Sequence, residues 1–177
     1  MIGGRTVRPD QISGILTLRP GIFAPELRAI HASDREYVAT ELNAFLLEWL
    51  MAQSCPVLNR PSLSCLAGPN WRVEQWINAA AQLGVPVRTH RRHVGNDLET
   101  HENDQAIELI SVGERCFGCD DDRLQSWSRR LGEASATDLL CTRFSLSGGE
   151  LLSAHPWPRL TDAAVLAAVR ERLGGKR

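Results

Sequence analysis

Lysine is almost absent from this sequence. All but one of the 20 lysine and arginine residues are arginine, and the exception, Lys176, lies at the end of the chain. A site that needs a lysine on a phosphate therefore cannot be built inside the chain. The formal net charge of −1 gives no general attraction to nucleic acid or to an anionic membrane. We expect neither among the partners of this protein.

Long apolar runs and a paired set of cysteines are also missing. No stretch of 18 apolar residues could form a membrane-spanning helix, and residues 1–10 lack the apolar core of a secretory signal. The five cysteines are an odd number, which fits reduced thiols better than a disulfide framework. These features predict a cytoplasmic protein. Its 177 residues, of which 43% are hydrophobic, suffice for a genuine core.

The first half has the element order of a parallel sheet. The clearest element is a helix over 34–53, where apolar residues recur at helical spacing behind a capping box formed by Ser33 and Glu36. A second helix is expected between Asn70 and Gly84. Short strands are expected at 12–18, at 56–59 and from 85 to 87. This β-α-β-α-β order is typical of parallel strands joined by right-handed crossovers.

The second half has the pattern of antiparallel hairpins with helices. Residues 106–117 and 139–154 each read as two short strands around a glycine-containing turn. Helices follow a cap at Asp120 or Asp121 and another at Thr161. The predicted fold class is thus α/β, with a small parallel β-α-β-α-β half followed by an antiparallel hairpin-plus-helix half. The predicted division is an N-terminal α/β lobe over 1–87, an exposed polar connector over 88–105 and a C-terminal α+β lobe over 106–177, which can pack as one continuous domain.

A polar pocket is one candidate binding site. Tyr37 and Glu41 share a face of the first helix because they are four residues apart. Asn59 and Arg60 end the strand at 56–59, and ligands of open α/β sheets gather outside the carboxyl ends of strands. The alternative is a buried hydrogen-bonded pair, with Arg60 in a surface ion pair.

The connector contributes a second candidate. Arg88, Arg91 and Arg92, together with His90 and His93, could bind an anion or a phosphate. The acidic residues that follow between 97 and 104 could instead neutralise them, which makes a solvated loop the competing interpretation.

A Cys-x-x-Cys motif gives a third candidate, a metal site. Cys116 and Cys119 could bind Zn²⁺ together with His90 and His93, because thiolate and imidazole groups suit tetrahedral zinc. The alternative is structural, with both thiols packed as small apolar groups. Trp157, between two prolines, is a candidate interface anchor.

Several short motifs resemble the ATP-grasp family of the RimK-like kind. The strand end Asn59-Arg60-Pro61 and the segment 84–87 are similar to the N-terminal lobe of that family. Residues 110–118 look like its strand pair, 138–154 like its closing hairpin and 156–158 like its proline-rich exit. The resemblance covers residues 12–87 and 106–173.

The departures from this family decide what the resemblance implies. Active members carry a nucleotide-gripping subdomain with two lysines between these halves, where this chain has only 89–105. Their closing hairpin holds Glu and Asn ligands for Mg²⁺, whereas residues 151–156 here contain no carboxylate and no amide. Mg²⁺ prefers oxygen ligands, and phosphoryl transfer depends on cations.

The resemblance therefore implies a pseudoenzyme without a cofactor. Such a chain would be an accessory or binding protein for a ligase or a peptide-modifying enzyme, and its partner would be a protein or a second copy. The alternative is an enzyme that uses zinc at the His/Cys site, or ATP and Mg²⁺ at a nucleotide site completed by a partner chain.

Overall fold

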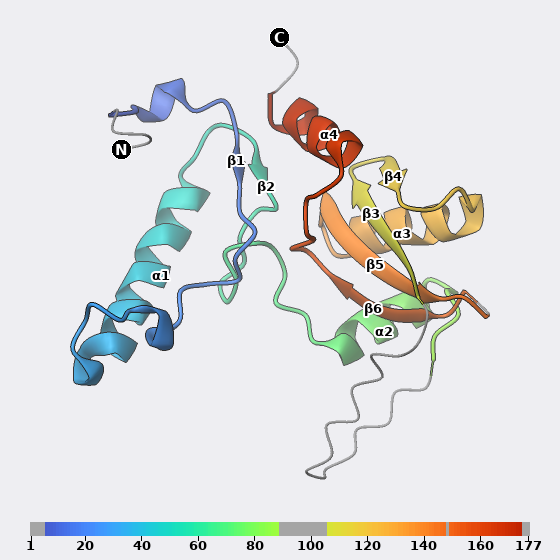
Figure 1. Ribbon diagram of the computed structural model, residues 1–177, viewed down its shortest axis with the longest axis horizontal. Coiled ribbons are helices and arrows are strands. Elements are labelled where there is room, and N and C mark those ends of the chain that lie inside the picture. The colour runs from blue at the N-terminus through green and yellow to red at the C-terminus, as the bar shows by residue number, and fades with distance from the viewer. Residues whose placement is uncertain (1–5, 89–105, 148, 175–177) are drawn as a thin grey trace.

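The computed structural model describes residues 6–88, 106–147 and 149–174. It contains a parallel pair of two-residue strands and a four-stranded antiparallel sheet in the order β4-β3-β5-β6 (Figure 1). The strands are β1 (Ile15–Leu16), β2 (Val57–Leu58), β3 (Ala106–Val112), β4 (Arg115–Phe117), β5 (Leu139–Ser145) and β6 (Leu151–His155). The predicted α/β class, with its parallel part before its antiparallel part, is confirmed.

Four α-helices accompany the strands. They are α1 (Arg35–Met51), α2 (Val73–Gln82), α3 (Asp122–Ala134) and α4 (Ala163–Gly174), and three 3₁₀ turns precede α1, at Pro9–Gln11, Ala24–Glu26 and Ala32–Asp34. The helix expected over 34–53 is therefore present, and so are both hairpins. No helix within the described ranges is long and apolar enough to cross a membrane.

The helix caps differ in part from the prediction. Asp121 caps α3, because its carboxylate accepts hydrogen bonds from the backbone of Arg123 at 2.9 Å and of Leu124 at 3.3 Å. The prediction of a capping box at Ser33 is wrong. Ser33 belongs to a 3₁₀ turn, and its hydroxyl donates to the Asp34 carboxylate at 2.7 Å instead of accepting from the first turn of α1.

The segment expected as a third parallel strand has a different neighbour. Val87 forms an isolated parallel bridge with Leu151 of β6, and the backbone N–H of Leu151 donates to the Pro86 carbonyl at 2.8 Å. This segment extends the edge of the antiparallel sheet and is not paired with β1 or β2.

One face of the antiparallel sheet packs against α2 and α3. Trp76 from α2, Leu124 and Leu131 from α3, and Leu109 and Phe144 from the sheet are each at most 1% exposed and belong to one apolar cluster. Helices from both halves of the sequence thus cover this face (Figure 1). The division into lobes at 87 and 106 stays a prediction.

The opposite face is covered by α4 at one end. Val165 and Val169 of α4 pack with Val112 of β3 and Leu139 of β5, and Leu58 of β2 completes this cluster. The second core therefore joins the short parallel pair to the antiparallel sheet.

Asn59 adds a polar clasp at this junction. Its side chain is 1% exposed. Its Oδ1 accepts from the Leu139 backbone N–H at 2.8 Å, and its Nδ2 donates to the carbonyls of Leu139 at 2.8 Å and Pro156 at 3.2 Å. The amide thereby connects the end of β2 to the start of β5 and to the residue that follows β6.

The clasp predicts a large loss of stability for Asn59→Ala. The change removes three hydrogen bonds and leaves buried backbone groups unpaired, so we expect the free energy of unfolding to fall by about 3 kcal/mol. Urea denaturation followed by far-UV circular dichroism measures this. The control is Asn78→Ala on the exposed side of α2, where a change within about 0.5 kcal/mol is expected. Similar losses for both variants would contradict the clasp.

Candidate functional site

Asn59 and Arg60 lie together, but their side chains have different surroundings. The Asn59 amide is occupied by the backbone bonds described above. Arg60 is exposed and has no hydrogen bond or ion pair within the described ranges. Both line a cavity of about 870 Å³ between the end of β2, the β3–β4 turn, α3 and α4. The expected position at a strand end is therefore correct for Arg60, whose role as a ligand-binding residue stays a prediction.

Ion pairs occupy much of the wall of this cavity. Arg172 donates to both carboxylate oxygens of Asp138 at 3.0 Å, and Arg115 pairs with Glu171 at 2.9 Å. These side chains are about half exposed or more, so solvent weakens the pairs and each contributes little stability. The cavity is a charged, water-accessible hollow.

Tyr37 and Glu41 are not part of this cavity. Both side chains lie on the exposed side of α1, and Tyr37 is 69% exposed. They do share a helix face, as the spacing predicts. The structure does not bring this face together with Asn59 and Arg60.

The basic candidate residues are described only in part. Arg88 is half-buried and its guanidinium lies 3.4 Å from the Glu150 carboxylate. Arg91, Arg92, His90 and His93 fall outside the described residues. Anion binding by this segment stays a prediction.

The Cys-x-x-Cys motif makes local hydrogen bonds. The Cys116 thiol donates to the Gln125 carbonyl at 3.6 Å, and the Cys119 sulfur accepts from the Asp121 backbone at 3.3 Å. Gly118 between them has φ +103°, and a Cβ there would lie 2.3 Å from the Glu108 carbonyl oxygen. A glycine is thus required for this tight turn, which explains part of the motif without a metal.

No group of three or more metal-binding side chains is found among the residues that the structure describes. His90 and His93, the other two proposed ligands, are outside them. Burial raises the pKa of the Cys116 thiol, with a smaller opposing effect from Arg129. A zinc site at Cys116 and Cys119 stays a prediction.

A second hollow, which the sequence did not predict, is an apolar groove. It has a volume of about 600 Å³ and is lined by Phe23, Leu47, Leu63 and Trp157 among others. Phe23 is 55% and Leu63 90% exposed. The available signal was the presence of large apolar residues in two loops, at 22–23 and 63, together with Trp157 between prolines.

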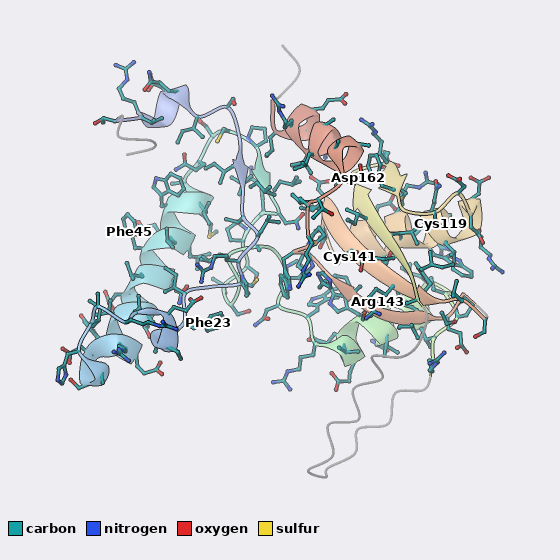
Figure 2. The ribbon with its side chains drawn as sticks, in the orientation of Figure 1. Phe23, Phe45, Cys119, Cys141, Arg143 and Asp162 are labelled. Atoms are coloured by element: carbon teal, nitrogen blue, oxygen red, sulfur yellow. The ribbon has the colours of Figure 1, made fainter. Side chains whose placement is uncertain are left out.

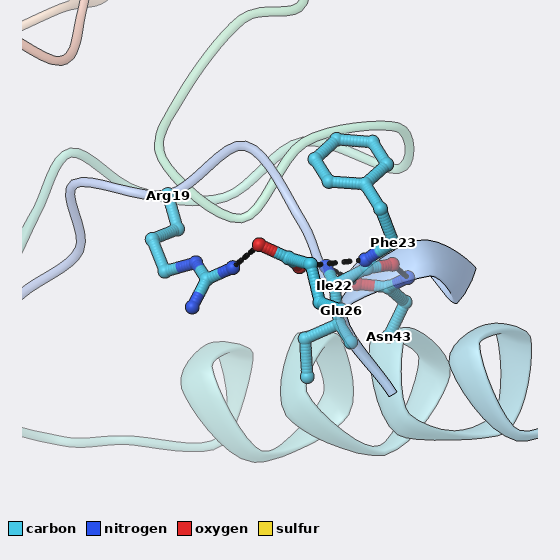
Figure 3. A network of polar contacts seen from close by, with 5 residues as sticks. All are labelled: Arg19, Ile22, Phe23, Glu26 and Asn43. Atoms are coloured by element: carbon cyan, nitrogen blue, oxygen red, sulfur yellow. Dashed lines mark hydrogen bonds and ion pairs between the residues drawn. The ribbon is translucent and has the colours of Figure 1, made fainter. Parts of the chain in front are cut away.

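A polar network shapes one wall of this groove (Figure 3). The Asn43 amide of α1 accepts from the Ile22 backbone N–H and donates to its carbonyl, both at 2.8 Å. Glu26 accepts from the Phe23 backbone N–H at 3.0 Å and pairs with Arg19. These bonds hold the loop that carries Phe23 against α1, so the aromatic ring remains presented at the groove.

The comparisons with known proteins concern the fold. No protein-family model matches the sequence, and no curated protein matches it. The chain is similar in structure to the macrocyclase MdnB from Microcystis aeruginosa MRC, with a TM-score of 0.55 and 12% sequence identity. The match covers 98% of this chain and 76% of that chain. At this identity the likeness shows the fold alone.

The cysteines provide a test of the packing around β5. Burial, aided by Glu108, raises the pKa of the Cys141 thiol to about 12. At pH 8 only about one thiol in ten thousand would be ionised, and the thiolate is the reactive form. We expect iodoacetamide to modify the half-exposed Cys119 while Cys141 stays unmodified, as read by peptide mass spectrometry.

The same labelling in urea is the control, where both cysteines should react. Equal rates for Cys141 and Cys119 in the folded protein would contradict the burial of Cys141.

Proposed function

We propose that this chain is a non-catalytic, ATP-grasp-like accessory or binding protein that acts beside a peptide-modifying enzyme. Support comes from two directions. The fold is similar to that of MdnB, which is described as a macrocyclase. The sequence lacks the internal lysines that active ATP-grasp members place on the nucleotide phosphates, since its one lysine is Lys176.

The observation that carries this proposal is the composition of β6. Residues 151–156 include neither a carboxylate nor an amide, and the polar side chains there are Ser153 and His155. Mg²⁺ bound to a nucleotide is held by carboxylate oxygens and phosphates. A strand with a hydroxyl and an imidazole supplies a poor site for that ion.

The first test is thermal unfolding with and without millimolar MgATP. A ligand at a hundred times its dissociation constant stabilises the folded state by about 2.7 kcal/mol. For a chain of this size that corresponds to a shift of roughly 2–4 °C for each kcal/mol. We expect no shift beyond that caused by MgCl₂ alone, as followed by tryptophan fluorescence.

A clear shift with MgATP would contradict the non-catalytic proposal. It would favour the alternative in which a nucleotide site survives in this chain.

An exposed apolar surface supports a protein partner. Tyr37, Phe45 and Met51 on α1 are between 58% and 69% exposed. Large apolar side chains that face solvent are the groups that a protein partner would bury. Figure 1 shows α1 at the side of the molecule away from α3, and Figure 2 shows Phe45 at that outer edge.

Charge favours a different protein over a second copy as the partner of this surface. Glu41 and Glu48 flank Phe45 at helical spacings of four and three residues, and both are exposed. Two copies that met through this face would bring like charges together. A partner with basic residues around an apolar patch would be attracted instead.

This interpretation predicts that Phe45→Ser has little effect on the isolated chain. Its side chain is 62% exposed and has little packing to lose, so we expect a change in the free energy of unfolding within about 0.5 kcal/mol. The comparison variant is Leu50→Ala, which empties a site that is 2% exposed and should lose about 3 kcal/mol. Urea denaturation at two protein concentrations measures both. A large, concentration-dependent loss for Phe45→Ser would identify self-association and contradict the choice of a different partner.

A further inference from the structure

The antiparallel sheet leaves part of one face open. Glu108, Arg143 and Ser153 are directly opposed on β3, β5 and β6, and Ile110, Cys141 and His155 form the next row. Side chains two residues apart on a strand share a face, so these rows continue the face that α4 covers at Val112 and Leu139. Glu108 is exposed, while Arg143, Ser153 and His155 are half-buried. Solvent therefore reaches a polar end of an otherwise apolar face.

Arg143 is the first unusual feature of this end. Its guanidinium has no hydrogen bond and no ion pair within the described ranges, although Glu108 is its neighbour on β3. Arginine carries five donors and no acceptor. Figure 2 shows Arg143 next to Cys141 along β5, on the body of the sheet. The side chain is thus placed to receive an anion.

His155 is the second, independent feature. Its Nδ1 is buried and has no hydrogen-bond partner within the described ranges. Burial lowers the pKa of the imidazole, with a smaller opposing effect from Glu108, so the ring is neutral at pH 7. A neutral imidazole can donate or accept at Nδ1 according to its tautomer. A buried polar atom without a partner is unfavourable, and because this nitrogen is covered, a ligand reaches it only if the neighbouring side chains move.

Trp157 connects these polar groups to the apolar groove. The His155 and Trp157 rings are stacked at 6.0 Å with an angle of 26°. Trp157 also lines the groove of about 600 Å³ beside Phe23, Leu47 and Leu63. Neighbouring side chains therefore lead from the Arg143 cation through the His155 ring to Trp157 and the apolar hollow.

We propose that this surface binds a peptide segment in which a carboxylate adjoins large apolar residues. Arg143 would donate to the carboxylate, Glu108 would accept from a peptide N–H, and the groove beside Trp157 would take the apolar side chains. Glu108 beside a single arginine repels a multiply charged phosphate more strongly than a singly charged carboxylate. This proposal rests on the proposed function, because it names the class of ligand that an accessory protein of a peptide-modifying enzyme would hold.

The experiment is a titration followed by NMR of the His155 ring. The probes are N-acetyl-Glu-Leu-Phe amide and its Gln analogue, which differ in one charge, with inorganic phosphate as the third ligand. We expect the Glu peptide to move the His155 resonances and to bind about tenfold more tightly than the Gln peptide, because a charged hydrogen-bonded pair is lost in the latter. Phosphate should bind more weakly than the Glu peptide.

Arg143→Gln should abolish the preference for the Glu peptide, and Arg143→Lys should leave an intermediate preference because it keeps the charge without the planar fork. Arg130→Gln is the matched control. Arg130 lies on α3, on the other side of the sheet, and donates to the Leu83 carbonyl at 2.9 Å. This variant should keep the full preference.

Three outcomes would overturn the proposal. They are equal binding of the two peptides, an unchanged preference in both Arg143 variants, and tighter binding of phosphate than of the Glu peptide. If neither peptide moves the His155 resonances, neither binds at this surface, and that result belongs to the first of these outcomes. Failure here is separate from failure of the proposed function, which is decided by stabilisation with MgATP.

Discussion

The amide of Asn59 is the constraint on which the arrangement of this molecule depends. The strands β1 and β2 are two residues long each, too short to hold an independent sheet. Three hydrogen bonds from one buried side chain attach their end to the start of β5 and to Pro156. The adjoining Leu58 then completes the core under α4. The charged cavity beside Arg60 exists because this junction is fixed.

The antiparallel sheet supplies the second organising feature, since its two faces serve different purposes. One face is closed by α2 and α3 around Trp76 and Phe144, each at most 1% exposed. The other is closed at one end by α4 and open at the end that carries Arg143. Burial of the first face stabilises the sheet, which leaves the open end available for polar groups that the fold does not itself require. The guanidinium of Arg143, which has no partner within the described ranges, is tolerated there because it is partly exposed to solvent.

Local signals explain which elements could be predicted. Helix α1 and the two hairpins follow from apolar periodicity and glycine turns, which act within a few residues. The prediction for Ser33 was wrong because a 3₁₀ turn, and not the helix itself, contains that residue. Asn59 was expected beside a ligand because of its place at a strand end. Its actual partners lie 80 and 97 residues further along the chain, a separation at which no sequence pattern acts.

The sequence by itself determined the chemical inventory of this protein: one lysine at the end of the chain, no carboxylate in residues 151–156, and the periodicities that form the helices and hairpins. The tertiary structure alone decided which side chains face solvent and which lie together on one face of the sheet. Tyr37 and Glu41 share a helix face in any fold, but packing of the opposite face of α1 turned them to solvent. Arg143 and His155 meet on one sheet face because strand register, set by contacts between distant segments, brings β5 and β6 together. Burial is a property of the whole assembly of elements, and that is why only the structure could show which polar groups on this face have no partner within the described ranges.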